Sequence, residues 1–85
     1  MKKVKNELNK FDVALGDIMR QLRKAQKMST SFVGEKIGIT HQMVSLYELG
    51  KSAFTVTMLK KFCELYGVKY YDVIKQAGES IGDEI

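Results

Sequence analysis

The nine residues HQMVSLYEL, numbered 41–49, carry the side chains whose types and spacing best suit a chemical task. At about 100° per residue, a helix gathers five of them on one arc, namely His41, Ser45, Leu49, Gln42 and Leu46. A glutamine amide can form two hydrogen bonds with the edge of an adenine, and a leucine can pack on the methyl group of a thymine. This arc therefore predicts the reading of base pairs in a DNA major groove.

The opposite arc of the same segment is suited to a protein core, and it holds Met43, Tyr47, Val44 and Glu48. A carboxylate that is removed from water without a partner costs free energy, so a buried Glu48 needs a basic neighbour. Arg23, near the end of the first expected helix, is the best candidate for this ion pair. The alternative is that Glu48 lies at the rim of the core and is solvated.

Two short helices and a tight turn must position this segment. Ser29 or Thr30 can cap a helix that ends before Gly38, because a short hydroxyl side chain accepts a hydrogen bond from a free backbone amide. Gly38 suits the left-handed conformation that follows many helix ends. Thr40 can then cap the next helix, expected over residues 41–49 and stopped by the glycine that follows.

Apolar stripes predict the remaining helices, so the expected fold is an all-α, five-helix domain. The first helix is expected over residues 13–26, or from residue 6 if its stripe continues, the fourth over 55–66 and the fifth over 70–77. We divide the chain into a basic N-terminal extension (1–12), a folded domain (13–77) and a flexible acidic tail (78–85). The extension is either a disordered arm that follows the DNA backbone or a helix that packs on the domain or on a second subunit.

Charge is concentrated near the N-terminus. The net charge is +4, and residues 1–28 hold eight basic and three acidic side chains, a local balance of 8 − 3 = +5. A basic region on a small domain favours a polyanionic partner, although solubility alone would also account for it.

Several classes of function are disfavoured by the composition. One histidine and one cysteine give no metal-ligand cluster, and the chain has no glycine-rich phosphate loop, so we expect neither an enzyme nor a cofactor. Cys63 lies on the apolar side of the fourth expected helix and is interpreted as a core residue. No apolar run is long enough to span a membrane, and we expect a cytoplasmic location.

From Leu15 to Val68 the chain resembles the Cro/CI-type helix-turn-helix family, also called the XRE family, of phage and bacterial DNA-binding regulators. The matching residues are Gly16, Met19, Leu22, Arg23, Ser29, Val33, Gly34, Gly38, Ile39, Thr40, Val44, Ser45, Glu48, Gly50, Leu59, Gly67 and Val68. The agreement extends across five helices rather than over one short motif.

The resemblance implies a five-helix domain whose third helix enters the major groove, commonly with two copies on a palindromic operator. It implies base-reading positions at His41, Gln42, Ser45 and Leu46. Family members often pair an arginine of the first helix with a glutamate of the third, which agrees with the pair argued above. We therefore expect a sequence-specific regulator of double-stranded DNA in a bacterium or phage, a repressor that acts as a homodimer.

Two residues depart from the family pattern. Thr30 stands where members often have a glutamine that braces the phosphate, and Leu49 stands where they often have an asparagine that contacts it. Phosphate contacts must then come from hydroxyls and backbone amides at helix ends and from nearby cations. The candidates are Thr30, Ser31, Thr40, Lys51, Ser52 and Arg20.

Two other functions remain open. The fold can serve as an antitoxin-like or adaptor domain that binds a protein partner, with four apolar anchors at Leu46, Leu49, Ile81 and Ile85. It can also bind DNA without sequence preference. Specific DNA binding predicts retarded migration of a palindromic DNA site, falling steeply as salt rises. Tighter binding of this site than of random duplex at moderate salt would separate specific DNA binding from both alternatives.

Overall fold

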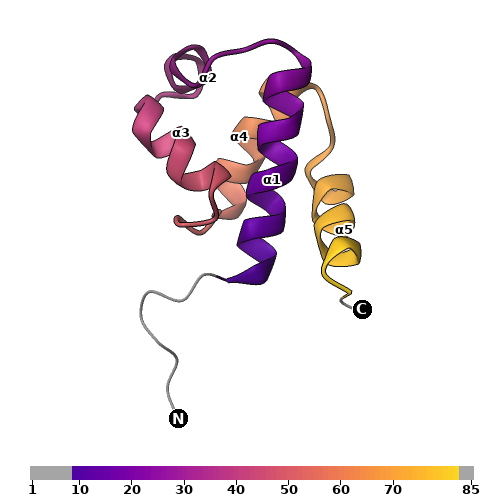
Figure 1. The fold of residues 1–85 in the computed structure, drawn as a ribbon. Coiled ribbons are helices and arrows are strands. Elements are labelled where there is room, and N and C mark those ends of the chain that lie inside the picture. The colour runs from indigo at the N-terminus through magenta and orange to yellow at the C-terminus, as the bar shows by residue number, and fades with distance from the viewer. Residues whose placement is uncertain (1–8, 83–85) are drawn as a thin grey trace.

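The computed structural model describes residues 9–82, which form five helices and no strand (Figure 1). The helices are α1 (Lys10–Ala25), α2 (Thr30–Ile37), α3 (His41–Glu48), α4 (Val56–Tyr66) and α5 (Tyr70–Ser80). The predicted all-α, five-helix fold is confirmed.

Two helix boundaries differ from the prediction by more than one residue. Helix α1 begins at Lys10, because the Asn9 side chain caps it by accepting hydrogen bonds from the amides of Phe11 (2.8 Å) and Asp12 (3.1 Å). Residues 10–12 were assigned to the extension but lie in this helix, which agrees with the alternative that the apolar stripe continues before residue 13.

Helix α5 continues three residues past its predicted end. Gly78 is buried against the domain, and the Ser80 hydroxyl donates a hydrogen bond to the Ala77 carbonyl at 3.0 Å. Residues 78–80 were predicted to lie in a flexible tail and form the last turn of a packed helix instead. Residues 1–8 of the proposed N-terminal extension and residues 83–85 of the acidic tail lie outside the described residues, whereas residues 81 and 82 form a turn after α5.

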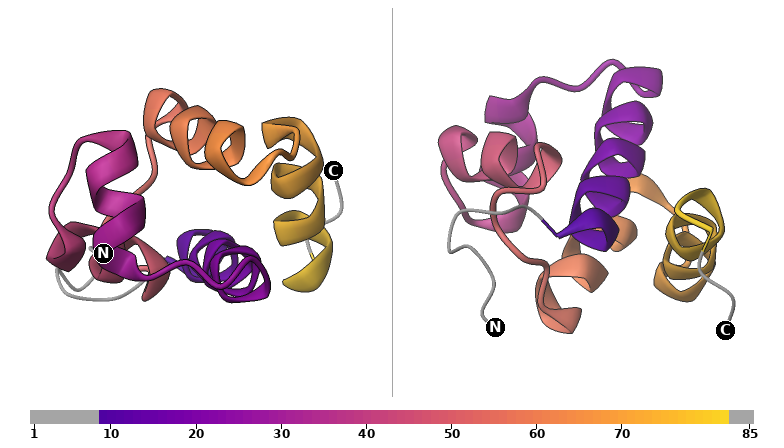
Figure 2. Two further views of the ribbon diagram at one scale, coloured as in Figure 1. Left: turned by 90° about the horizontal axis from the view of Figure 1, so that it is seen from above. Right: turned by 60° about the horizontal axis from the view of Figure 1, so that its bottom comes forward.

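Helix α1 lies between α3 on one side and α5 on the other (Figures 1 and 2). Helix α2 packs on α3 and α4, and α4 also contacts α1 and α5. The core fills the space between these helices, and its largest fully buried side chains are Phe62, Met19, Val33, Val44 and Cys63.

An aromatic cluster holds α4 against the end of α3. The ring centroid of Phe62 lies 5.6 Å from those of Tyr47 and Phe54 in edge-on arrangements that aromatic quadrupoles favour. Because α3 is only eight residues long, it depends on such packing rather than on its own helix propensity.

Candidate nucleic-acid interface

The two faces of α3 are separated by burial as the sequence predicted. On the inner face Val44, Tyr47 and Glu48 are buried, with Val44 completely so. On the outer face His41 and Gln42 are exposed, Leu46 is 38% exposed, and Ser45 is half-buried. The helix therefore presents hydrogen-bonding groups and one apolar side chain to an approaching ligand.

Local hydrogen bonds fix the starts of both α2 and α3. Ser29 Oγ caps α2 by accepting from the Phe32 amide (3.0 Å), and Thr40 Oγ1 caps α3 by accepting from the Met43 amide (3.1 Å). Gly38 adopts a left-handed conformation (φ 83°), which a side chain would oppose. The sequence predicted these turn and cap residues because their signals are local.

Gly34 allows the turn to fold closely over α2. A Cβ atom at this position would lie 2.5 Å from the carbonyl oxygen of Ile39, so backbone fills the place of a side chain. The Gly38 and Ile39 amides both donate to the Gly34 carbonyl, at 2.8 and 2.9 Å. The orientation of α3 relative to α2 is thereby set by backbone contacts.

Arg23 and Glu48 form the predicted ion pair. Arg23 Nε donates to Glu48 Oε2 at 2.7 Å, and Nη2 donates to Oε1 at 3.0 Å. The two side chains are 12% and 4% exposed. The hydrogen bond to Glu48 raises the pKa of Arg23, although burial acts in the opposite direction. This two-pronged contact ties α3 to α1.

Arg23 makes a third contact that the sequence argument missed. Its Nη1 donates to the Met28 carbonyl at 3.0 Å, in the connection between α1 and α2. One guanidinium therefore joins α1, the connection that leads into α2, and α3, which are the elements that position the outer face of α3.

Gly16 is a second residue whose contact the sequence argument missed. A Cβ atom there would lie 2.5 Å from the Glu48 carbonyl oxygen and nearer still to that of Tyr47. Gly16 thus allows α1 to touch the backbone of α3. The available signal was its place on the apolar stripe of α1, beside the buried Leu15 and Met19.

The candidate phosphate contacts lie on three parts of the surface. Thr30 and Ser31 occupy the first turn of α2, and Thr40 caps α3. Lys51 and Ser52 follow α3 in its connection to α4, with the lysine exposed. Because α2 and α3 pack together, the candidates at the ends of these two helices lie in the same part of the molecule as the outer face of α3.

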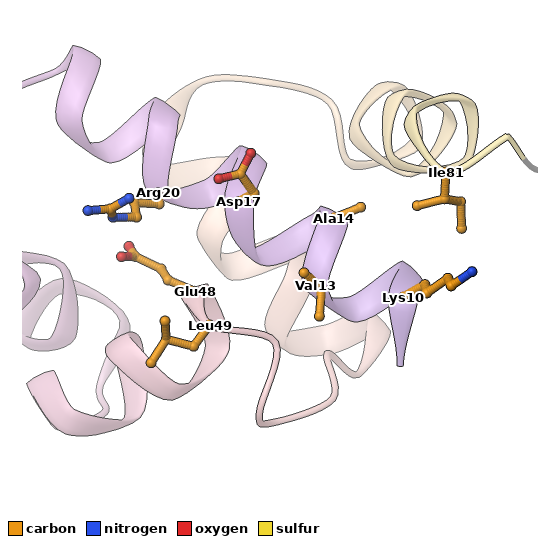
Figure 3. A pocket seen from close by; sticks show the side chains of 8 residues that line it. All are labelled: Lys10, Val13, Ala14, Asp17, Arg20, Glu48, Leu49 and Ile81. Atoms are coloured by element: carbon orange, nitrogen blue, oxygen red, sulfur yellow. The ribbon is translucent and has the colours of Figure 1, made fainter. Parts of the chain in front are cut away.

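The sixth phosphate candidate, Arg20, lies apart from these residues in an open groove of about 530 Å³ (Figure 3). The groove runs between α1 and the ends of α3 and α5, and its lining residues are Lys10, Val13, Ala14, Asp17, Arg20, Glu48, Leu49 and Ile81. Leu49 is 54% exposed and Val13 is 38% exposed. The groove is therefore partly apolar, with charged side chains around it.

Residues suited to other chemistry are few in the described part of the chain. Cys63 is buried, and this burial raises the pKa of its thiol to about 11. Residues 9–82 contain no group of three or more potential metal ligands. Within that range, none of the helices has the length and apolarity needed to cross a membrane.

Sequence comparison identifies relatives that are regulators. Residues 19–73 match the helix-turn-helix family. An uncharacterised HTH-type transcriptional regulator, y4aM, of Sinorhizobium fredii (strain NBRC 101917 / NGR234) is 30% identical over 83 residues. The match covers 94% of this chain, which spans only 58% of the length of that relative.

Structure comparison finds the same fold in three kinds of protein. The clp gene regulator ClgR of C. glutamicum matches with a TM-score of 0.78 and 22% identity, over 87% of this chain and 96% of that one. The restriction-modification controller protein C.AhdI of Aeromonas hydrophila matches with a TM-score of 0.67 and 20% identity, over 72% and 92% of the two chains.

Hydroxypropylphosphonic acid epoxidase of S. wedmorenis matches with a TM-score of 0.70 and 19% identity, over 76% of this chain but 35% of the enzyme. The likeness to an enzyme is therefore confined to one part of it and concerns the fold alone. The sequence relative is named as a transcriptional regulator rather than as an enzyme, in agreement with the prediction. By the match over residues 19–73, the chain belongs to the helix-turn-helix family, of the Cro/CI (XRE) type.

Proposed function

We propose that this protein is a sequence-specific transcriptional regulator that inserts α3 into the major groove of double-stranded DNA. One observation carries the proposal: the inner face of α3 is buried and ion-paired, while its outer face exposes the polar His41 and Gln42 together with Leu46. A rigidly held helix with free outward side chains is what direct readout of base edges requires. Membership of the helix-turn-helix family supports the same function.

Gln42 is the principal hydrogen-bonding reader in this proposal. It is exposed in the first turn of α3, and the N-terminal residues of a recognition helix are those that contact base edges. Its amide matches the N6 donor and N7 acceptor of adenine. His41 and Ser45 flank it on the same face, and each can hydrogen-bond a base edge or a phosphate.

Phosphate contacts fix the register of the helix in the groove. We assign them to the first turn of α2 (Thr30, Ser31), to Thr40, and to Lys51 and Ser52 beyond α3, with Arg20 on α1 as a further contact. The hydroxyl oxygen of Thr40 accepts the Met43 amide, so this hydroxyl retains a proton to donate to a phosphate.

Two copies would bind a palindromic operator, one in each half-site. A helix of eight residues reads only a few base pairs, so a second copy extends the site and raises its specificity. We propose repression as the outcome, because occupation of an operator that overlaps a promoter excludes polymerase without further contacts.

Selection from a random DNA pool, followed by sequencing, tests the proposal. The selected duplex should bind more tightly than a scrambled duplex, with an affinity that falls steeply as salt rises. Gln42→Ala should weaken binding to the selected duplex roughly 10- to 100-fold, since a bidentate contact to a base is lost.

The matched control is Gln76→Ala, which removes an exposed glutamine from α5, outside the proposed DNA contacts. It should leave DNA affinity unchanged, and circular dichroism should show both variants folded. If no selected duplex binds better than random duplex at moderate salt, the proposed function is wrong.

The partly apolar groove favours a second candidate function, an antitoxin-like or adaptor domain that binds a protein. Leu49, which stands where family members often have an asparagine, is 54% exposed and lines this groove. Val13, Ala14 and Ile81 line the same groove (Figure 3). A failure of the DNA selection in a folded, stable preparation would favour this candidate over the first.

A further inference from the structure

The bases that the outer face of α3 can read are limited by its lack of lysine, arginine and acidic side chains. Residues 41–46 include no lysine, arginine, aspartate or glutamate. Guanine is most often read by arginine or lysine, and cytosine by an acidic side chain. The bases that this face can distinguish must therefore be recognised by amide, hydroxyl, imidazole or apolar contacts.

Leu46 is the apolar member of this face. It is 38% exposed, whereas its neighbours Val44 and Tyr47 are buried in the core. A leucine has no hydrogen-bonding group, so it distinguishes base pairs only by apolar contact. The C5-methyl group of thymine is the apolar group that normal base pairs present in the major groove.

The position of Leu46 relative to Gln42 suits this contact. The two residues are four apart and share one side of α3, so they are separated by about 6 Å along the helix axis. Successive base pairs are about 3.4 Å apart along DNA. A helix lying along the groove would therefore bring Leu46 to a base pair one or two steps from the one that Gln42 reads.

We propose that Leu46 is a specificity-determining residue that reads the C5-methyl group of a pyrimidine, in thymine or in 5-methylcytosine. The two bases carry the same methyl group at the same place in the groove. Methylation of a cytosine at this position would consequently raise the affinity of the protein for its site. The inference rests on the proposed insertion of α3 into the major groove.

Leu49 provides a matched control on the same outward arc. It follows α3 as its C-cap, about 4.5 Å farther along the axis than Leu46, and it lines the groove beside Val13 (Figure 3). It is thus placed beyond the end of the helix that contacts base edges. Leu46→Ala and Leu49→Ala remove the same atoms from two exposed positions.

The experiment uses the best duplex from the random-pool selection. Each thymine is first replaced singly by uracil, which removes the methyl group and retains base pairing. At the sensitive position, four duplexes are then compared, with T·A, U·A, 5-methylcytosine·G and C·G pairs. Each methyl group should strengthen binding of the wild-type protein about fourfold, the effect expected for burying one methyl group.

Leu46→Ala should abolish both methyl effects, and Leu49→Ala should retain them, with both variants folded by circular dichroism. Methyl effects that survive Leu46→Ala, or that vanish in Leu49→Ala alone, would overturn the assignment. A sequence preference without any uracil-sensitive position would overturn methyl reading and leave the proposed function standing. An effect of thymine without one of 5-methylcytosine would overturn the predicted response to cytosine methylation. The absence of any preferred duplex would instead refute the proposed function.

Discussion

The side chains of Arg23 and Glu48 support the outer face of α3 without being part of it. Both are largely removed from water, and the two-pronged geometry satisfies both oxygens of the carboxylate. A buried pair of this kind adds little net stability relative to an apolar pair, but the loss of one partner leaves an uncompensated charge. Its effect is to fix the position of α3.

A double-mutant cycle should reveal this coupling. Glu48→Ala and Arg23→Ala should each lower the free energy of unfolding by about 3 kcal/mol, because each leaves a buried charge unpaired. The double variant should lose less than the sum of the two. Urea unfolding followed by circular dichroism measures all three, and additive losses would show that the two side chains do not interact.

At the scale of residues, the features that the sequence predicted are those that follow from the periodicity of a single helix. The division of α3 into inner and outer faces follows from helical periodicity alone, and the demand of Glu48 for a cation follows from its place on the inner face. The bond from Arg23 to the Met28 carbonyl was not predictable in this way. It depends on the path of the connection after α1, which no periodic pattern specifies.

The contact between α1 and α3 depends on two glycines. Gly16 leaves room for the backbone of Tyr47 and Glu48, and Gly50 packs against Val13 in a left-handed conformation (φ 76°). Gly16 would be a weak choice on local grounds, since glycine inside a helix lowers its stability by about 1 kcal/mol relative to alanine. Gly50 lies just past the end of α3, where its left-handed conformation favours glycine. The close approach of the two elements is the compensating gain.

Gly16→Ala should therefore destabilise the protein, although alanine is the better helix former. The added methyl group would meet backbone rather than a flexible side chain, so α1 and α3 must separate. We expect a loss of about 1–3 kcal/mol in the free energy of unfolding, as for other overpacked sites. The same displacement of α3 should weaken DNA binding.

Lys24→Ala, on the exposed side of the same helix, is the control and should change stability by less than about 0.5 kcal/mol. Thermal and urea unfolding of both variants would measure the effect. A Gly16→Ala protein as stable as the wild type would mean that the two helices do not need this contact.

Among the elements, local signals were predictable and tertiary ones were not. Gly38 and Thr40 end or begin helices through contacts within a few residues, and their roles were recognised. The last turn of α5 was missed, because it is stabilised by burial of Gly78 against the domain. The acidic and glycine-rich composition of that segment gave no indication of such packing.

The molecule as a whole has a positive charge of +4, yet residues 41–46 are uncharged. In the proposed function, attraction to phosphate therefore arises from cations outside the reading face, including Arg20 and Lys51. The arrangement of five helices around one core was expected from the family resemblance. The groove among α1, α3 and α5 was not, because it depends on where three chain-distant segments meet.

The stability of the whole domain should fall in alkali because of Cys63. Its thiol has an ordinary pKa of 9.0, which burial raises to about 11. Below pH 9 the thiol is protonated in both states, so its contribution to stability is fully present. Between about pH 9 and 11 the unfolded chain loses the proton while the native protein retains it, and stability decreases.

Urea unfolding at intervals across this pH range measures the decrease, which is at most about 1.4 kcal/mol per pH unit for one group. Cys63→Ala should show a shallower decrease than the wild type. Tyr66, whose pKa is also raised by burial, acts in the same direction in both proteins. Equal slopes in the two proteins would contradict a role for the thiol.

The exposed positions of α3 have a consequence for the evolution of the protein. His41, Gln42 and Leu46 project away from the core, so their replacement leaves the caps, the close backbone contacts and the ion pair intact. Substitutions at exposed positions of this kind usually change stability by less than about 0.5 kcal/mol. After a gene duplication, successive substitutions at these positions would therefore change the operator that is recognised, while every intermediate protein still folds. Glu48, on the opposite face of the same helix, has no such freedom.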